Sequence, residues 1–352
     1  MLKSKTYIAI PPGETIKEQL DDRGMTQKEF ADRMDLTPKH ISQLINGKVS
    51  LTPETAGKLE LVFGIPAKFW LKLEASYRDK LIKVERENAL DAEKELQKKY
   101  PYTAMAKEGL VPKTNNPKEK IINLCLFFEV TSLTLLEEKE EVLFPVACRK
   151  LANTETSDYA MRVAVQTAKR ASRTIETAPI DLEKLREKLN EIRSLTLSRD
   201  MSFMDKLSGI LASCGIAIVY LPELKGSFLH GITFHDNKKI VLGITMRGKY
   251  ADKFWFSLFH EIAHILLHHI QKGFSITEKH EEEANKMSED LLIPASSLEN
   301  FYRAHDFSKT SIVDFANRIG TSPGIVVGRM QRNSKIGYNM FNDLKLKYAL
   351  NN

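Results

Sequence analysis

The first eighty residues combine short apolar stretches at helical spacing with sharp breaks between them. Apolar positions recur every three or four residues, and the stretches are interrupted at Gly24, at Asp35-Leu36 and at Asn46-Gly47. Thr26 stands at the start of the second stretch, and Pro38 stands in the first turn of the third. This pattern predicts short helices joined by tight turns.

The rest of the chain is predicted to be mostly helical, with one small sheet. From residue 66 to about 97 the chain continues into a charged helix, placed at 78–99, and residues 158–175 and 180–195 form amphipathic helices. Short apolar runs bounded by turn residues predict strands at 216–221, 228–234 and 239–243. We therefore expect a mainly α protein with a small β-sheet, of the α+β class.

Residues 26–45 carry the pattern of a helix-turn-helix. Two short helices flank the turn at Asp35-Leu36, and Glu29 occupies the capping-box position relative to Thr26. No acidic residue occurs from Leu36 through Pro53, as expected for a surface that meets phosphates. The alternative is an ordinary helical hairpin whose polar residues are simply solvated.

An apolar run at residues 255–268 contains His260-Glu261-x-x-His264 and predicts a buried helix. Because positions four apart share one face of a helix, His260 and His264 can bind one zinc ion together. Glu261 lies one step round the helix, where it can accept a proton without being a ligand. The alternative is a core helix that happens to carry histidines.

A catalytic zinc ion usually has three protein ligands, so a third is expected downstream. The next predicted helix runs from Glu278 to the residues before Pro294. Helical spacing places Glu281 on a face of small and apolar residues, so we choose it over the two glutamates that follow. Two histidines remain weaker alternatives: His280, and His268, which we expect to line the core or support the site.

The segments around these residues resemble the ImmA/IrrE family of metallopeptidases. The similarity lies in Phe-Ser-Leu-Phe-His-Glu-Ile-Ala-His and in the downstream Glu-Glu-Glu-Ala-Asn and Leu-Leu-Ile-Pro, and residues 315–331 resemble the ending of longer members. The resemblance implies a gluzincin-like metallopeptidase core with Zn²⁺ at His260, His264 and Glu281 and with Glu261 as the catalytic residue. Members often cleave a transcriptional repressor or a similar regulator. Met287-Ser288 departs from the family's usual Phe-Ala, which changes packing rather than ligands.

Residues 10–80 resemble the Xre-type repressor domain, in its HigA antitoxin-like branch. The resemblance implies a five-helix helix-turn-helix domain in which Gln27 anchors a phosphate and the start of the third helix faces the major groove of a double-stranded operator. The residues expected to bind DNA are Gln27, Thr37, Lys39, His40, Ser42, Gln43 and Lys48.

We predict five consecutive regions. They are a helix-turn-helix DNA-binding domain at 1–80, a charged helical linker at 81–117, a helical middle region at 118–198, a zinc metallopeptidase core at 199–300 and a C-terminal helical region at 301–352.

Composition limits the remaining choices. A chain of 352 residues with 42% hydrophobic and 28% charged residues is typical of modular globular proteins. The net charge of +6 permits nucleic-acid binding without arguing for it. Cys125, Cys148 and Cys214 are too few and scattered for a disulfide framework. Without an apolar signal core or a run of about 18 apolar residues, a cytoplasmic protein with no membrane partner is expected.

Three function classes follow from these patterns. The first is a DNA-binding transcriptional regulator with a zinc metallo-endopeptidase that cleaves a protein partner. The second is an antitoxin-like autorepressor of a toxin-antitoxin module, whose metal-binding domain binds a partner without cleaving it. The third is a purely structural zinc domain, which would have no need of Glu261. A homodimer is compatible with each of them.

Overall fold

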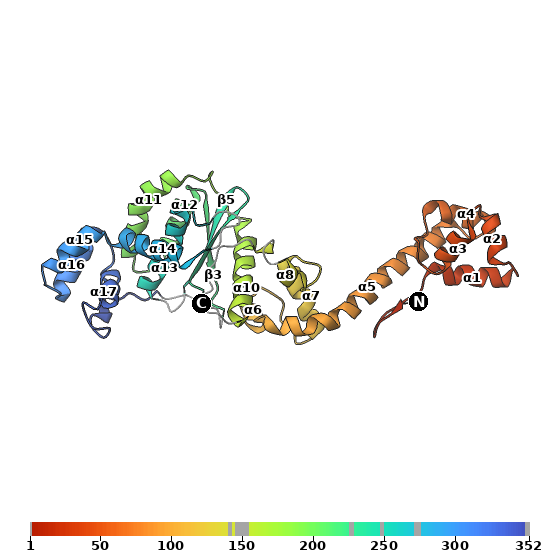
Figure 1. Cartoon of the computed structure of the whole chain (residues 1–352), viewed down its shortest axis with the longest axis horizontal. Helices are drawn as coiled ribbons and strands as arrows, with labels where there is room; N and C mark the ends of the chain where they lie inside the picture. Colours follow the sequence, from red (N-terminus) through yellow and green to blue (C-terminus); the bar gives the residue numbers. More distant parts are fainter. Residues whose placement is uncertain are drawn as a thin grey trace. The chain divides into compact units, whose positions relative to one another are not determined.

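The computed structural model describes residues 2–139, 143–144, 155–224, 229–246, 250–270 and 276–348. The chain divides into two compact units, residues Met1–Glu95 and Leu96–Asn352. Both are rich in helix and the second contains a small sheet, so the α+β class is confirmed. The units are drawn from red to orange and from orange to blue in Figure 1.

The first unit is a bundle of short helices followed by a long one. Its helices are α1 (Pro12–Asp22), α2 (Gln27–Arg33), α3 (Pro38–Ile45), α4 (Pro53–Phe63) and the first part of α5 (Ala67–Lys99). Two short strands, β1 (Leu2–Lys3) and β2 (Ile8–Ala9), pair antiparallel before α1. The core is formed by apolar side chains from all five helices, with Phe30, Phe63 and Trp70 in ring contact at its centre.

Local sequence signals explain where these helices begin and turn. The Thr26 hydroxyl accepts the Glu29 backbone N–H, and the Thr37 hydroxyl accepts the His40 backbone N–H, so both residues cap their helices. The Glu29 carboxylate pairs with Arg33 one turn later. Asp35 makes the tight turn with φ of 49°, the left-handed region that Asp tolerates better than most residues.

The second unit surrounds one sheet with helices. Its helical segments are α6 (Tyr102–Lys107), α7 (Pro117–Phe128), α8 (Leu135–Glu138), α10 (Glu155–Ser172), α11 (Leu182–Ser194), η1 (Leu195–Leu197), α12 (Phe203–Ala212), α13 (Ala251–Leu266), α14 (Glu278–Leu292), α15 (Ala295–Arg303), α16 (Lys309–Ile319), α17 (Pro323–Arg332) and η2 (Asn342–Leu344).

The sheet has the strand order β3-β5-β4, with β3 (Ile216–Leu221), β4 (Gly231–Asp236) and β5 (Lys239–Thr245). β3 is parallel to β5, and β4 is antiparallel to it. Alternate residues of a strand face opposite sides. One side packs against α10 through Val219, Ile232 and Val241. The other side faces α12 and α13 through residues such as Leu242, so the strands place α13 against the sheet.

The C-terminal segment is tied to α13. The Trp255 indole N–H donates to the Tyr348 hydroxyl at 2.7 Å, and both side chains are fully buried beside Phe203. The end of the described chain therefore helps to hold the helix that carries His-Glu-x-x-His.

The five predicted regions remain a prediction. The expected boundary at residue 80 falls inside α5, which is continuous from Ala67 to Lys99. Phe228, at the start of one predicted strand, and Cys148 lie outside the described residues. Among the described residues, no helix is both long and apolar enough to cross a membrane.

Candidate metal centre and DNA-binding surface

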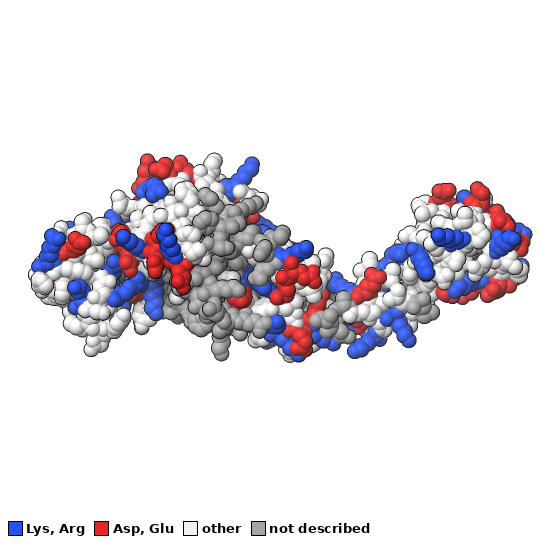
Figure 2. Space-filling view, in the orientation of Figure 1, with Lys and Arg blue, Asp and Glu red and all other residues white. Residues whose placement is uncertain are grey.

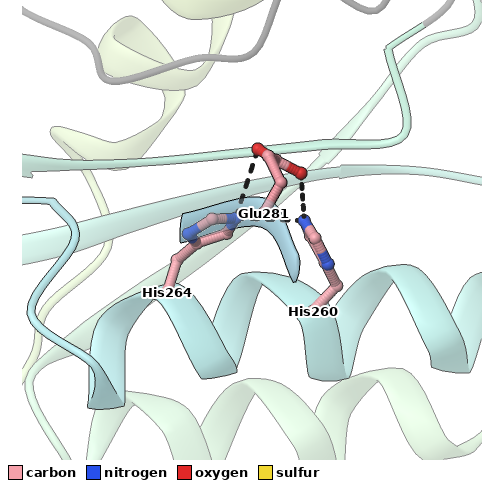
Figure 3. Close-up of side chains that lie close together, drawn as sticks. All are labelled: His260, His264 and Glu281. Atoms are coloured by element: carbon pink, nitrogen blue, oxygen red, sulfur yellow. Dashed lines mark hydrogen bonds and ion pairs between the residues drawn. The ribbon is translucent and has the colours of Figure 1, made fainter. Parts of the chain in front are cut away.

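The two histidines of the motif point to one spot from the buried face of α13. The Nε2 atoms of His260 and His264 lie 3.0 Å apart, and their rings meet edge to face (Figure 3). The four-residue spacing on a straight helix explains this arrangement, because it stacks the side chains one turn apart. His264 is buried and His260 is partly exposed.

Glu281 reaches the same spot from the first turn of α14. Its Oε2 lies 3.3 Å from His260 Nε2, and its Oε1 lies 3.6 Å from His264 Nε2. Ala284 and Ser288 follow on the same face of α14 and are fully buried, so small side chains accompany Glu281 toward the interior. Both residues that follow Glu281 are exposed.

Glu261 is held against the neighbouring strand rather than toward Glu281. The Thr233 hydroxyl of β4 donates to Glu261 Oε2 at 2.5 Å, in a buried position. A Cβ atom added at Gly231 would lie 2.6 Å from both Cγ and Oε1 of Glu261. Gly231 and Thr233 share one face of β4, so this strand provides both the space and the hydrogen bond that fix the carboxylate.

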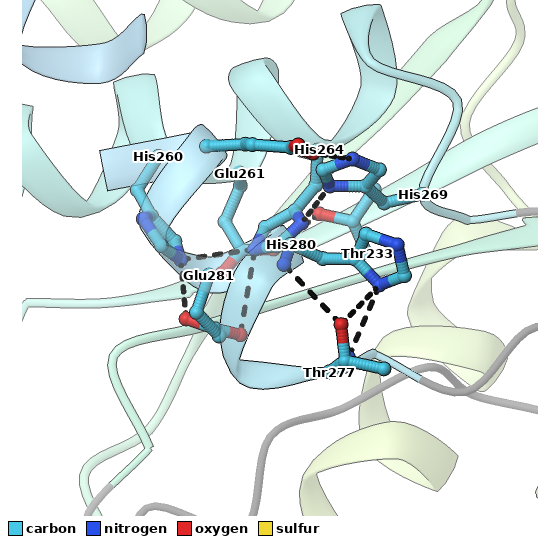
Figure 4. A network of polar contacts seen from close by, with 9 residues as sticks. Thr233, His260, Glu261, His264, His269, Thr277, His280 and Glu281 are labelled. Atoms are coloured by element: carbon cyan, nitrogen blue, oxygen red, sulfur yellow. Dashed lines mark hydrogen bonds and ion pairs between the residues drawn. The ribbon is translucent and has the colours of Figure 1, made fainter. Parts of the chain in front are cut away.

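A second line of side chains supports His264 from behind. His264 Nδ1 lies 3.1 Å from His269 Nδ1 (Figure 4). On its other side, His269 Nε2 lies 3.4 Å from Glu283 Oε2. His269 is buried and packs beside the ring of His280. If Nε2 of His264 is free to bind a metal, its Nδ1 must carry the proton, and His269 then accepts it and donates its own Nε2–H to Glu283.

This support was missed in the sequence, and the expectation for His268 is corrected. α13 ends at Leu266, and His268 adopts a left-handed φ of 61° and is exposed, so it neither lines the core nor supports the site. The turn brings His269 under His264 instead. His280 is not placed with the ligand set, because its Nδ1 accepts the Thr277 backbone N–H and completes a capping box at the start of α14.

Burial dominates the electrostatics of the cluster. It raises the pKa of Glu261, and it lowers the pKa of His264 to about 4, with the charge of His260 acting in the same direction. His264 is therefore neutral at pH 7, which is the form that ligates metals. Burial also disfavours charge on His260, but its hydrogen bond to Glu281 and the charges of Glu261 and Glu281 outweigh burial, and its pKa is raised.

The residues fit a metal ion by their chemistry. One atom from each of His260, His264 and Glu281 can be chosen so that all lie within 4.8 Å of one another. Two imidazole nitrogens and a carboxylate oxygen are ligands that zinc accepts. Three converging lone-pair donors in a mostly buried pocket would repel one another, and a cation between them would satisfy all three.

The candidate centre lies in a cavity of about 880 Å³. The cavity is lined by α13 and α14, by the start of β4, by α17 and by residues near the C-terminal end of the described chain. His230, directly before β4, also lines it. A cavity of this volume is in the usual range for ligand sites, and Glu261 is among the residues that line it.

In the first unit, the residues predicted to bind DNA lie on or beside α2 and α3. Gln27 begins α2 and is exposed, and Lys39 and His40 lie in the first turn of α3. Lysine and arginine are interspersed with aspartate and glutamate over the coloured parts of the face in Figure 2, in keeping with the modest net charge. All seven are exposed or half-buried: Gln27, Thr37, Lys39, His40, Ser42, Gln43 and Lys48.

Comparisons with known proteins match both units separately. Residues 16–70 match the helix-turn-helix family, and residues 215–331 match the IrrE N-terminal-like domain. The chain is 41% identical over 66 residues to the uncharacterized HTH-type transcriptional regulator YddM of Escherichia coli (strain K12). The aligned stretch covers 19% of this chain and 70% of that protein. It is also 39% identical over 67 residues to virulence-associated protein A′ of Dichelobacter nodosus. That stretch covers 19% of this chain and 58% of that protein.

Among solved structures, an addiction module antidote protein of a HigA family from Coxiella burnetii aligns with this chain at 28% sequence identity and a TM-score of 0.22. The alignment covers 24% of this chain and 94% of that protein's chain.

Fold and site together define a helix-turn-helix protein joined to a metallopeptidase-like domain. The chain belongs to the HTH-type transcriptional regulators of the Xre type, and its second unit carries an IrrE N-terminal-like domain.

Proposed function

We propose that this regulator is also a zinc-dependent metallo-endopeptidase that cleaves a protein partner such as a repressor. The observation that carries the proposal is the placement of Glu261. Its buried carboxylate lines the same cavity as the candidate ligands, yet it is positioned by Thr233 and Gly231 rather than by the ligand set. A purely structural zinc site has no use for such a residue.

The roles of the side chains follow from this arrangement. His260, His264 and Glu281 would hold Zn²⁺, which when bound lowers the pKa of water and polarises a carbonyl group. Glu261 accepts the proton of the attacking water and passes it to the leaving amine nitrogen. Since Thr233 occupies Oε2, we assign Oε1 as the accepting atom. Burial raises the pKa of Glu261, which makes its carboxylate a stronger base.

The strand beside the motif offers a place for an extended substrate. β4 pairs with β5 along one side only among the described residues, which leaves an edge for an additional strand. Pairing of a peptide with a sheet edge is a common recognition mode, in which backbone hydrogen bonds supply affinity. A photocrosslinker in a trapped substrate should therefore label residues of β4, and labelling confined to other elements would contradict this placement.

The first unit would bring the peptidase to an operator. Gln27 and Lys48 would contact the DNA backbone, and Thr37, Lys39, His40, Ser42 and Gln43 would lie toward the major groove. A protein that binds DNA works beside the chromosome, so we place it in the cytoplasm. DNA binding would locate the protein near the regulator that it cleaves, or cleavage would relieve repression.

The test compares Glu261→Gln with Glu282→Gln, the same substitution at an exposed position on α14 that lies outside the cluster. Each variant is co-expressed with regulators encoded by neighbouring genes, and cleavage is followed by mass spectrometry. Glu261→Gln should lower the cleavage rate by at least ~10², the usual scale for general acid–base catalysis, with zinc content and melting temperature unchanged. Glu282→Gln should cleave like the parent.

Equal cleavage in both variants would rule out this mechanism. A partner that binds with Glu261-independent affinity and is never cut would favour the antitoxin-like alternative, in which the second unit only binds. A toxin encoded immediately beside this chain would point the same way.

A further inference from the structure

The cavity continues well beyond the candidate metal centre. Four-residue spacing on α13 and on α14 places one row of side chains from each helix along it. The row on α13 is Asp252, Phe256 and His260, and the row on α14 is Glu281, Asn285 and Glu289. The motif residues lie at one end of these rows, and the other end is closed by α17.

That far end carries an excess of positive charge. Glu289 is shared by two guanidinium groups: its Oε2 contacts Arg329, and its Oε1 lies 2.8 Å from Arg332 Nη1. Lys345 is matched by Asp252 at 3.2 Å. Since one carboxylate serves two arginines, one guanidinium charge is left without an opposite charge in this group.

The two arginines are placed differently. The side chain of Arg329 is 18% exposed, and its buried Nε has no hydrogen-bond partner among the described residues. The Arg332 side chain is 51% exposed and lies over the Phe256 ring at 4.2 Å. A buried guanidinium N–H without an acceptor is costly, so this end of the cavity is suited to a second acceptor.

The distance from the metal centre suits an extended peptide. The Phe256 ring lies 6.3 Å from the ring of His260, with Arg332 on the Phe256 ring in turn. These two contacts in series put the Arg332 guanidinium within the span of about three residues of extended chain from His260, at roughly 3.3 Å per residue.

We propose that Arg329 and Arg332 form a subsite for a carboxylate of the peptide substrate, within about three residues of the scissile bond. This rests on the proposed peptidase function and names the substrate class: a segment with an aspartate or glutamate at that distance. Guanidinium groups bind carboxylates through paired N–H donors, and an incoming carboxylate would balance the second arginine.

The charges at the opposite end of the cavity differ. Glu261 and Glu281 line the cavity around the motif, and a bound Zn²⁺ would balance their two negative charges. The excess positive charge of the protein itself therefore lies at the arginine end. A C-terminal carboxylate offers the same chemistry and would make the substrate a chain end.

The test measures binding without cleavage, using the full-length Glu261→Gln chain. The probes are fluorescein-labelled decapeptide mixtures with C-terminal amides, one containing Asp and Glu and the other Asn and Gln at the same positions. A third mixture carries Asn and Gln with a free C-terminal carboxylate. Affinities are measured by fluorescence anisotropy at 50 mM salt, which limits screening.

The acidic mixture should bind about tenfold more tightly than the amide mixture, the scale of one charge-assisted hydrogen-bonded pair. Arg332→Gln should reduce this preference to less than about twofold. The matched control is Arg303→Gln, which removes the same charge at an exposed site on α15 outside the cavity. It should keep the preference, and unchanged melting temperatures show that both variants are folded.

The subsite is overturned if neither the acidic mixture nor the free-carboxylate mixture binds better than the amide mixture, or if the preference survives Arg332→Gln. Tight binding of the free-carboxylate mixture alone, lost in Arg332→Gln, would keep the arginine site but assign it to a chain end. Because these measurements need no turnover, an acid preference without Glu261-dependent cleavage would refute the peptidase alone, and cleavage without an acid preference would refute the subsite alone.

Discussion

Replacing His269 by phenylalanine tests whether the line His264–His269–Glu283 supports the metal centre. Phenylalanine keeps a ring of similar size next to His280 but removes the acceptor that lies 3.1 Å from His264 Nδ1. In the metal-bound form the lone pair of His264 Nε2 is used by the metal, so the proton must be on Nδ1. In the metal-free form, His264 can instead carry its proton on Nε2, so no buried N–H is left without an acceptor. The substitution therefore destabilises the metal-bound form but not the metal-free form.

The size of the effect follows from burial. A buried N–H left without an acceptor costs about 1–3 kcal/mol, which corresponds to roughly 5- to 150-fold in affinity. His269 is 4% exposed, so we expect His269→Phe to lower zinc affinity by about 100-fold, near the upper end for residues that support ligands. The Glu283 side chain is 43% exposed and its glutamine variant can still accept from His269, so Glu283→Gln should cost about tenfold or less.

The assay is competition for zinc against a chromophoric chelator, with each variant first stripped of metal. Glu282→Gln serves as the control, because it makes the same change of charge at the adjacent exposed position and should bind zinc like the parent. An affinity of His269→Phe within twofold of the parent, in a folded protein, would refute the proposed support of His264. A larger loss in Glu283→Gln than in His269→Phe would also contradict the proposed order of contacts.

Three further outcomes are expected. Glu281→Ala should bind zinc more weakly by metal analysis, and full zinc content in that variant would show that another residue completes the set. Gly231→Ala places a methyl group 2.6 Å from atoms of the buried Glu261 side chain, and this overpacking of about 1–3 kcal/mol should lower the melting temperature by several degrees. The control is Gly209→Ala in the interior of α12, where the added methyl group meets nothing within 4 Å and should not lower the melting temperature. Replacing Lys39 and Gln43 together by alanine should weaken specific operator binding in a footprinting assay, by about 1–3 kcal/mol for each base that is no longer recognised. The zinc content should stay unchanged. Loss of zinc as well would show that the two units are not independent.

The elements that the sequence predicted well depend on local signals. Thr26 and Thr37 cap their helices through contacts with residues three positions away, which a sequence pattern contains in full. The inward position of Glu281 followed similarly from the small residues on its face of α14. The order β3-β5-β4 was not predictable, because it depends on pairing between distant segments.

The incorrect expectation for His268 has a simple physical origin. The apolar pattern continues past Leu266, so periodicity alone extends the helix and places His268 on the ligand face. The chain instead leaves the helix through a left-handed residue, a conformation that histidine adopts more readily than most residues, and His269 takes the position behind His264. The pairing of Arg329 and Arg332 with Glu289 was also missed, since contacts between α17 and α14 leave no periodic trace in the sequence.

The contact between Gly231 and Glu261 has a consequence for reading the sequences of related chains. A relative could retain both histidines and all the glutamates of the centre and still lose its proton acceptor through one extra methyl group on β4. Such a chain would be counted as an enzyme by its motif and would behave as a metal-binding scaffold. Divergence from peptidase to pure regulator would then require a single codon change outside the motif, and the residue aligned with Gly231 would be the one to inspect first.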